Sequence, residues 1–94
     1  MAIRIVIYGK PGDGGAFAAM AQIRSLIREL RVDATVQIVT DEQQLQMNGI
    51  DDPPAVLIDG SQVSIGYVPS RTEMAGYIRQ RQTMLAGRGP SMDM

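Results

Sequence analysis

The chain has 94 residues and a formal net charge of −1, and it contains neither cysteine nor histidine. This length predicts one domain, near the size at which a single hydrophobic core holds without disulfides or metals. A charge near neutrality argues against general electrostatic binding to nucleic acid or anionic membranes. The missing cysteine and histidine exclude the usual zinc ligands, the usual general base near neutral pH and the common thiol nucleophile.

No segment has the features of a signal peptide or of a membrane span. The N-terminus lacks a basic region followed by an apolar stretch of signal length. No segment approaches the roughly 20 apolar residues that a transmembrane helix requires. We therefore expect a cytoplasmic protein without a membrane partner.

The first half of the chain predicts a βαβ unit followed by a short helix. Residues 3–8 are rich in β-branched residues and carry apolar side chains on both faces, which predicts a central strand. An amphipathic helix is predicted from about residue 15 to residue 31, with Asp13 as its N-cap. Its apolar positions, at steps of three and four residues, are Phe17, Met20, Ile23, Ile27 and Leu30. Residues 34–39 predict a second strand parallel to the first, and the short helix after it ends at Asn48-Gly49.

The second half predicts a β-hairpin. Residues 55–58 and 62–67 have the composition of two antiparallel strands, and Asp59-Gly60 between them is a strong turn signal. Regular alternation along the second strand places Val63 and Ile65 on one face.

The last predicted element is a helix. Ser70-Arg71-Thr72-Glu73 matches a capping box at its start, and Gly87 ends it. We expect a domain over residues 1–86 and a C-terminal tail over residues 87–94. The predicted order is β-α-β-α-β-β-α, an α/β fold with a four-stranded mixed sheet flanked by helices.

Three segments within residues 3–82 carry a resemblance to a known family. They are Ile5-Val6-Ile7-Tyr8-Gly9, Pro54-Ala55-Val56-Leu57-Ile58-Asp59-Gly60 and Gly66-Tyr67-Val68-Pro69-Ser70. The chain resembles thioredoxin-fold proteins, and most closely the small thioredoxin-like or glutaredoxin-like redox-active disulfide proteins. Those proteins carry a CxxC pair in the loop after the first strand, where this chain has Gly12 and Gly15. Neither glycine nor methionine supplies the thiolate that disulfide exchange needs.

The resemblance also implies a cis peptide bond between Pro53 and Pro54. In relatives the backbone beside this proline lies against the CxxC loop and pairs with an extended substrate or with glutathione. We therefore include Pro53 and Pro54 among the candidate binding residues. Tyr8 and Tyr67 complete this group because they could stack on a ligand near the loop, although packing is the more common role of such tyrosines.

The loop Gly12-Asp13-Gly14-Gly15 is the sharpest candidate site. Backbone N–H groups at a helix start, with Lys10 nearby, could bind a carboxylate or a phosphate. The alternative interpretation, which we favour, is that the glycines permit a tight turn and that Asp13 repels an anion. Asp13, Asp51 and Asp52 could also hold a hard cation, but capping and turn formation explain each of them, and we expect no metal.

These observations lead to two hypotheses about function. The first is a redox-inactive thioredoxin-like binding or accessory module that is not an enzyme, uses no cofactor and acts through a protein partner. Because strand edges invite pairing, a homodimer is a secondary expectation. The second is a glutathione- or anion-binding carrier or enzyme that uses the glycine loop and the region of Pro54. A third possibility, an engineered cysteine-free variant, ranks below these two. Such a variant would be expected to carry serine or alanine at positions 12 and 15, because glycine raises the entropic cost of folding.

Overall fold

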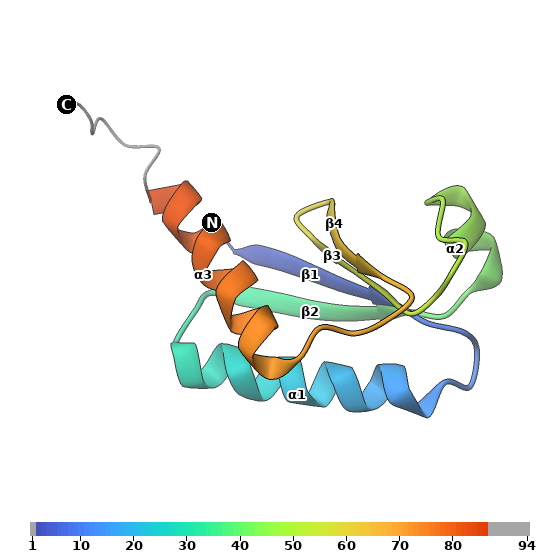
Figure 1. Ribbon diagram of the computed structural model, residues 1–94, viewed down its shortest axis with the longest axis horizontal. Helices are drawn as coiled ribbons and strands as arrows, with labels where there is room; N and C mark the ends of the chain where they lie inside the picture. The colour runs from blue at the N-terminus through green and yellow to red at the C-terminus, as the bar shows by residue number, and fades with distance from the viewer. Residues whose placement is uncertain (1, 87–94) are drawn as a thin grey trace.

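The structure, a computed structural model, describes residues 2–86. Seven elements follow one another along the chain (Figure 1). They are β1 (Ile3–Tyr8), α1 (Gly14–Leu30), β2 (Ala34–Val39), α2 (Glu42–Met47), β3 (Ala55–Ile58), β4 (Ser61–Ile65) and α3 (Arg71–Ala86). This order confirms the predicted α/β fold. The predicted tail, residues 87–94, lies outside the described residues.

The four strands form one mixed sheet in the order β2-β1-β3-β4. β1 runs parallel to β2 and antiparallel to β3, and β3 runs antiparallel to β4. The parallel pair is joined through α1, which crosses over the sheet as a βαβ unit requires. β1 is therefore a central strand, as its apolar composition predicts.

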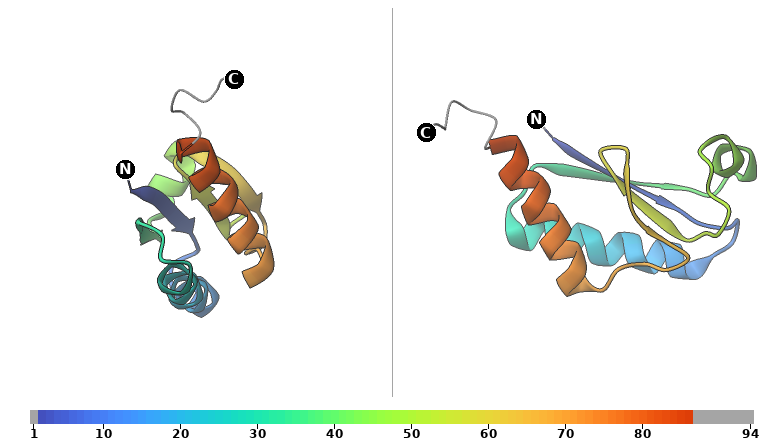
Figure 2. Two further views of the ribbon diagram at one scale, coloured as in Figure 1. Left: turned by 90° about the vertical axis from the view of Figure 1, so that its left-hand side faces the viewer. Right: turned by 45° about the horizontal axis from the view of Figure 1, so that its top comes forward.

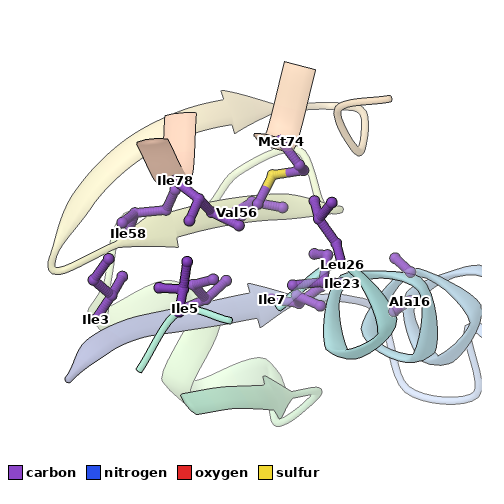
Figure 3. Packing of buried hydrophobic residues seen from close by; sticks show 12 residues of the cluster. Ile3, Ile5, Ile7, Ala16, Ile23, Leu26, Val56, Ile58, Met74 and Ile78 are labelled. Atoms are coloured by element: carbon purple, nitrogen blue, oxygen red, sulfur yellow. The ribbon is translucent and has the colours of Figure 1, made fainter. Parts of the chain in front are cut away.

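The main core lies between one face of the sheet and the helices α1 and α3 (Figures 2 and 3). Alternate residues of β1 point into it, and Ile3, Ile5 and Ile7 are at most 2% exposed. Met74 and Ile78 of α3 meet them across the core. α2 covers only the end of the opposite face, where a second cluster holds Tyr8, Leu45, Ile50 and Ala55. Among residues 2–86, no helix combines the length and apolar composition needed to cross a bilayer.

The predicted apolar face of α1 is wrong at one position. The helix buries Ala16, Ala19, Ile23 and Leu26, whereas Phe17 is 55% exposed. The cause is the helix period: at about 100° per residue, Phe17 lies about 120° around the helix from Ile23, whereas Ala16 lies about 20° from it. Ala16 therefore faces the sheet close to Gly9, where a Cβ added to Gly9 would lie 2.7 Å from the Cβ of Ala16, and Phe17 points to solvent.

The alternation expected in β4 is also wrong. Val56 pairs with Ser64 and Leu57 pairs with Gln62, so Val63 is an extra residue that forms a β-bulge. Val63 packs on the main core, whereas Ile65 lies opposite Ala55 on the other face of the sheet. The strand ends at Ile65 because Gly66 turns with a φ of 84°.

The predicted helix caps are present. Ser70 and Glu73 form a reciprocal capping box, in which the Ser70 N–H donates to Glu73 Oε1 over 3.0 Å and the Glu73 N–H donates to Ser70 Oγ over 3.2 Å. Asp41 caps α2, because its Oδ1 accepts from the Gln43 N–H at 3.0 Å. The capping box places the start of α3 where the sequence predicts it, and the Asp41 cap fixes the start of α2.

Asp59 ties the hairpin to β1 and α3. Asp59 and Gly60 have φ angles of 49° and 84°, as expected for the Asp-Gly turn. The Asp59 carboxylate accepts from the Arg4 N–H at 2.9 Å and from Arg81 Nε at 2.8 Å. Burial raises the pKa of Asp59, but the hydrogen bonds from Arg4 and Arg81 outweigh burial and hold this pKa below its usual value.

We expect the Asp59→Asn variant to be less stable than the wild type by roughly 1 kcal/mol at neutral pH. Asparagine tolerates the positive φ but carries no charge for Arg81. A carboxyl whose pKa is lowered on folding stabilises the protein above its unfolded pKa, so this difference should vanish as the pH falls through the lowered pKa. Urea unfolding at several acidic and neutral pH values measures it.

The exposed Asp33 on the connection between α1 and β2 provides the control. Its carboxylate makes no hydrogen bond within the described residues, so Asp33→Asn should leave the free energy of unfolding nearly unchanged. The Asp59 charge would not be the cause if both variants lost the same free energy of unfolding. The same holds if the loss in Asp59→Asn persisted at low pH.

Candidate functional site

The candidate residues lie around one end of the sheet (Figure 1). The last aligned row of residues across the four strands is Val39, Tyr8, Ala55 and Ile65. The segments that adjoin this row are residues 9–13, 40–41, 51–54 and 66–70. The register therefore brings together loops that are far apart in the sequence, and we call this region the loop end.

At the loop end, the start of α1 is capped by Asp13. Asp13 Oδ1 accepts from the Gly15 N–H at 2.9 Å, and the Asp13 carbonyl accepts from the Ala16 N–H at 3.2 Å. The Asp13 N–H in turn donates to the Lys10 carbonyl over 3.0 Å. A helix N-terminus favours a negative charge, and the Asp13 carboxylate supplies it from within the chain. An external anion would have to displace this carboxylate.

Two of the loop glycines have identifiable structural reasons. Gly12 has a φ of 80°, a conformation that side chains of L-residues disfavour. A Cβ on Gly15 would lie 3.1 Å from Asp13 Oδ1, so glycine leaves room for the capping carboxylate. Gly14 is exposed, and an added Cβ would meet nothing within 4 Å. Turn and cap geometry thus account for Gly12 and Gly15 without a ligand.

The turn at residues 51–54 has few backbone groups left for a ligand. The peptide bond between Pro53 and Pro54 is cis, and Pro53 has no N–H. The Pro54 carbonyl accepts from the Gly66 N–H at 2.8 Å. Gly66 lies so close to Asp52 that a Cβ added to Gly66 would be 2.7 Å from Asp52 Oδ2. An extended ligand beside Pro53 could therefore pair with its carbonyl but would find no donor on this residue.

An open depression of about 560 Å³ lies between the loop at residues 9–13, α2 and the proline turn. It is lined by Lys10, Pro11, Glu42, Leu45, Gln46, Ile50, Asp51 and Pro53. Of the predicted binding residues, only Lys10 and Pro53 belong to it. The carboxylates of Glu42 and Asp51 line it together with the single ammonium group of Lys10, so its charge does not favour an anion. The contribution of Glu42 and Gln46 was missed because it depends on where α2 packs, and no sequence motif encodes that position.

The two candidate tyrosines have different environments. Tyr8 is 8% exposed and packs with Leu45, Ile50 and Ala55, so it belongs to the core and offers no surface for stacking. Tyr67 is 50% exposed and follows β4 directly. The loop end thus presents Tyr67 but not Tyr8.

Large apolar side chains on the elements at the loop end are exposed. They are Phe17 in the second turn of α1, Met47 of α2, Ile65 at the end of β4, and Tyr67. Sequence reasoning missed Phe17 because repeated three-residue steps were counted as one stripe, although they drift around the helix and leave Phe17 about 120° from Ile23. No group of three or more metal-ligating side chains gathers within residues 2–86, and Asp13, Asp51 and Asp52 do not form one.

Comparison with known families identifies this architecture. The family model for the thioredoxin domain matches residues 4–79, so the chain belongs to the thioredoxin domain family. None of the curated proteins that were compared matches the chain. The sequence contains no cysteine, and thiol–disulfide exchange by this chain is therefore excluded.

We expect Asp13→Ala to lower the free energy of unfolding by about 1 kcal/mol, because the Gly15 N–H loses its acceptor. Asp13→Asn keeps a side-chain acceptor and should lose only the smaller favourable interaction of the charge with the helix dipole. Urea unfolding of the two variants and the wild type measures both effects. Equal stability of Asp13→Ala and the wild type would contradict the capping role.

Proposed function

We propose that this thioredoxin-domain protein is a redox-inactive, non-catalytic module that binds a protein partner through its loop end. The observation that carries the proposal is the combination of a cysteine-free helix start with exposed aromatic side chains at the same end of the sheet. We also propose that, within the thioredoxin domain family, this chain is similar to the small glutaredoxin-like proteins.

The start of α1 supports a binding rather than a redox role. In a dithiol protein, a helix N-terminus lowers the pKa of the attacking thiol and so stabilises a thiolate. Here the same helix end holds the Asp13 carboxylate, which is hydrogen bonded to Gly15. A carboxylate keeps the favourable charge at the helix end but cannot attack a disulfide.

The apolar surface supports a macromolecular partner. Phe17 and Tyr67 are 55% and 50% exposed, and aromatic residues are enriched among the residues that dominate binding energy at interfaces. Surface of this kind is common at interaction sites and is costly to leave in water. A partner that covers Phe17 and Tyr67 would remove this apolar area from solvent.

The second candidate, glutathione or anion binding, is less well supported. The Asp13 carboxylate already occupies the helix N-terminus, and Pro53 supplies no N–H for an extended ligand. Lys10 faces a depression that it shares with Glu42 and Asp51. Titration with millimolar glutathione or phosphate, followed by amide NMR shifts of residues 9–15, would favour this candidate if saturable binding appeared.

The partner surface can be tested with a paired set of variants. We expect the double variant Phe17→Ser/Tyr67→Ser to lose at least about tenfold in affinity for any protein that the wild type captures from cell extract. Isothermal titration with the purified partner measures the loss. Both side chains are at least half exposed, so the variant should retain the fold.

Met84→Ser is the matched control, because Met84 is 55% exposed like Phe17 but lies near the C-terminal end of α3. It should bind the partner as the wild type does. If both variants bind with wild-type affinity, the partner does not use the loop end. If no captured protein depends on Phe17 and Tyr67, the proposal fails.

We further propose that the positions of the lost thiol pair are Asp13 and Ala16 rather than Gly12 and Gly15. Asp13 stands at the helix cap, where a thiol would be acidified, and Ala16 follows three residues later. Gly12 precedes the cap, and its φ of 80° would strain a cysteine by roughly 1–2 kcal/mol.

Asp13→Cys/Ala16→Cys is therefore expected to form an intramolecular disulfide that dithiothreitol reduces. Gly12→Cys/Gly15→Cys should form it less completely and unfold more easily. Mass spectrometry and thiol titration quantify the disulfide, and thermal unfolding compares the stability of the two reduced proteins. The reverse order of yield would restore Gly12 and Gly15 as the thiol positions.

A further inference from the structure

The edge of the sheet at β2 has unpaired backbone groups. β2 is the outermost strand on its side of the sheet, and it pairs only with β1 within the described residues. The Ile3 N–H donates to the Asp33 carbonyl over 2.9 Å, and the Gly9 N–H donates to the Val39 carbonyl over 3.0 Å. Along a strand, the backbone groups of every second residue point to the same side, so these two bonds show that residues 33, 35, 37 and 39 point toward β1. The N–H and C=O groups of Ala34, Val36 and Ile38 therefore point away from β1.

This edge lacks the devices that normally protect an edge strand. β2 contains no charged residue, no proline and no bulge. At the other edge, β4 is a five-residue strand with a bulge at Val63. Bulges and charges blunt strand edges, and an unprotected edge is a template for a further strand. β2 is thus the edge of this sheet that is open to pairing.

A depression of about 400 Å³ runs between this edge and α1, which lies alongside β2 in Figure 1. It is lined by Arg24, Ile27, Arg28, Ala34, Thr35 and Val36. Arg24 and Arg28 are exposed and form no ion pair within residues 2–86, unlike Arg71 and Arg81, which pair with Glu29 and Asp59. The depression therefore has an apolar floor and two available guanidinium groups.

The spacing of the two arginines matches that of an added strand. Residues four apart on a helix are separated by about 6 Å along its axis. Side chains two apart on a strand are separated by about 6.6 Å. Carboxylates at alternate positions of a strand paired with β2 would thus meet Arg24 and Arg28 together. Arginine binds carboxylates through two parallel hydrogen bonds, which favours this match.

We propose that the β2 edge binds an extended acidic peptide segment as a fifth strand. The peptide backbone pairs with Ala34, Val36 and Ile38, and two acidic side chains at alternate positions pair with Arg24 and Arg28. This surface is distinct from the loop end, and its occupation does not depend on the function proposed for Phe17 and Tyr67.

Charge and backbone chemistry favour this occupant over others. A second copy paired through β2 about a two-fold axis would bring the Arg24 and Arg28 groups of both copies together, and like charges oppose that contact. A nucleic acid would supply phosphates to the arginines, but it has no peptide backbone to pair with the strand edge. An acidic peptide satisfies both requirements.

The test uses a short fluorescent peptide with two glutamates at alternate positions among valines and threonines. We expect saturable binding by fluorescence anisotropy that weakens with salt, and at least about tenfold weaker binding of the matched peptide with two glutamines. Arg24→Glu/Arg28→Glu should lose at least about tenfold in affinity, whereas Arg79→Glu, on the exposed face of α3, should bind nearly as the wild type does.

Two readouts identify the strand pairing itself. On peptide binding, the amides of Ala34, Val36 and Ile38 should become protected from hydrogen exchange, whereas those of Thr35 and Gln37, already bonded to β1, should change little. Val36→Pro removes an outward N–H without removing a bond to β1, and it should weaken binding.

The proposal is overturned if the wild-type protein shows no saturable binding, if protection appears outside β2, or if the glutamine peptide binds equally well. Sedimentation that shows dimers abolished by Val36→Pro would assign the edge to a second copy instead. Equal competition by single-stranded DNA would assign it to a polyanion. If Val36→Pro fails to fold, the exchange pattern of the wild type still decides the outcome.

Discussion

The burial of one face of β1 is the constraint on which the rest of the molecule depends. Ile3, Ile5 and Ile7 alternate along the strand and are at most 2% exposed. Each such side chain stabilises the fold by roughly 1.5–3 kcal/mol when it is removed from water. Because all three must face α1 and α3, a slip of one residue in the pairing of β1 would turn them to the opposite face of the sheet. The ladders to β2 and β3 keep the register in which all three stay buried.

The same register explains why the loop end exists and what it can do. Tyr8 closes β1 in the row that also holds Val39, Ala55 and Ile65, so the adjoining segments meet at one end. The helix that follows presents its N-terminus there, and an N-terminus stabilises any negative group beside it. In this chain Asp13 supplies that negative group, through the hydrogen bond that its carboxylate accepts from the Gly15 N–H.

Local hydrogen bonding is the part of this structure that the sequence predicts well. The caps at Asp13 and Ser70 and the turn at Asp59 each depend on residues within a few positions, so their sequence signals suffice. Phe17 was misplaced because three-residue steps drift around a helix of 3.6 residues per turn, which a stricter count of the period would have shown. Ile65 was misplaced because of the bulge in β4, which has no reliable signal in a single sequence since it is decided by pairing between separate strands.

The net charge of −1 conceals a difference between two surfaces of this small domain. Interactions between exposed charges are largely screened beyond the Debye length, about 8 Å at physiological salt, so the net charge gives no long-range attraction of polyanions. Recognition within the groove beside β2 is decided at shorter range, by Arg24 and Arg28. The loop end instead exposes Phe17 and Tyr67. We therefore propose that one surface selects for charge and the other for apolar shape, so that a partner that suits one has little reason to bind the other.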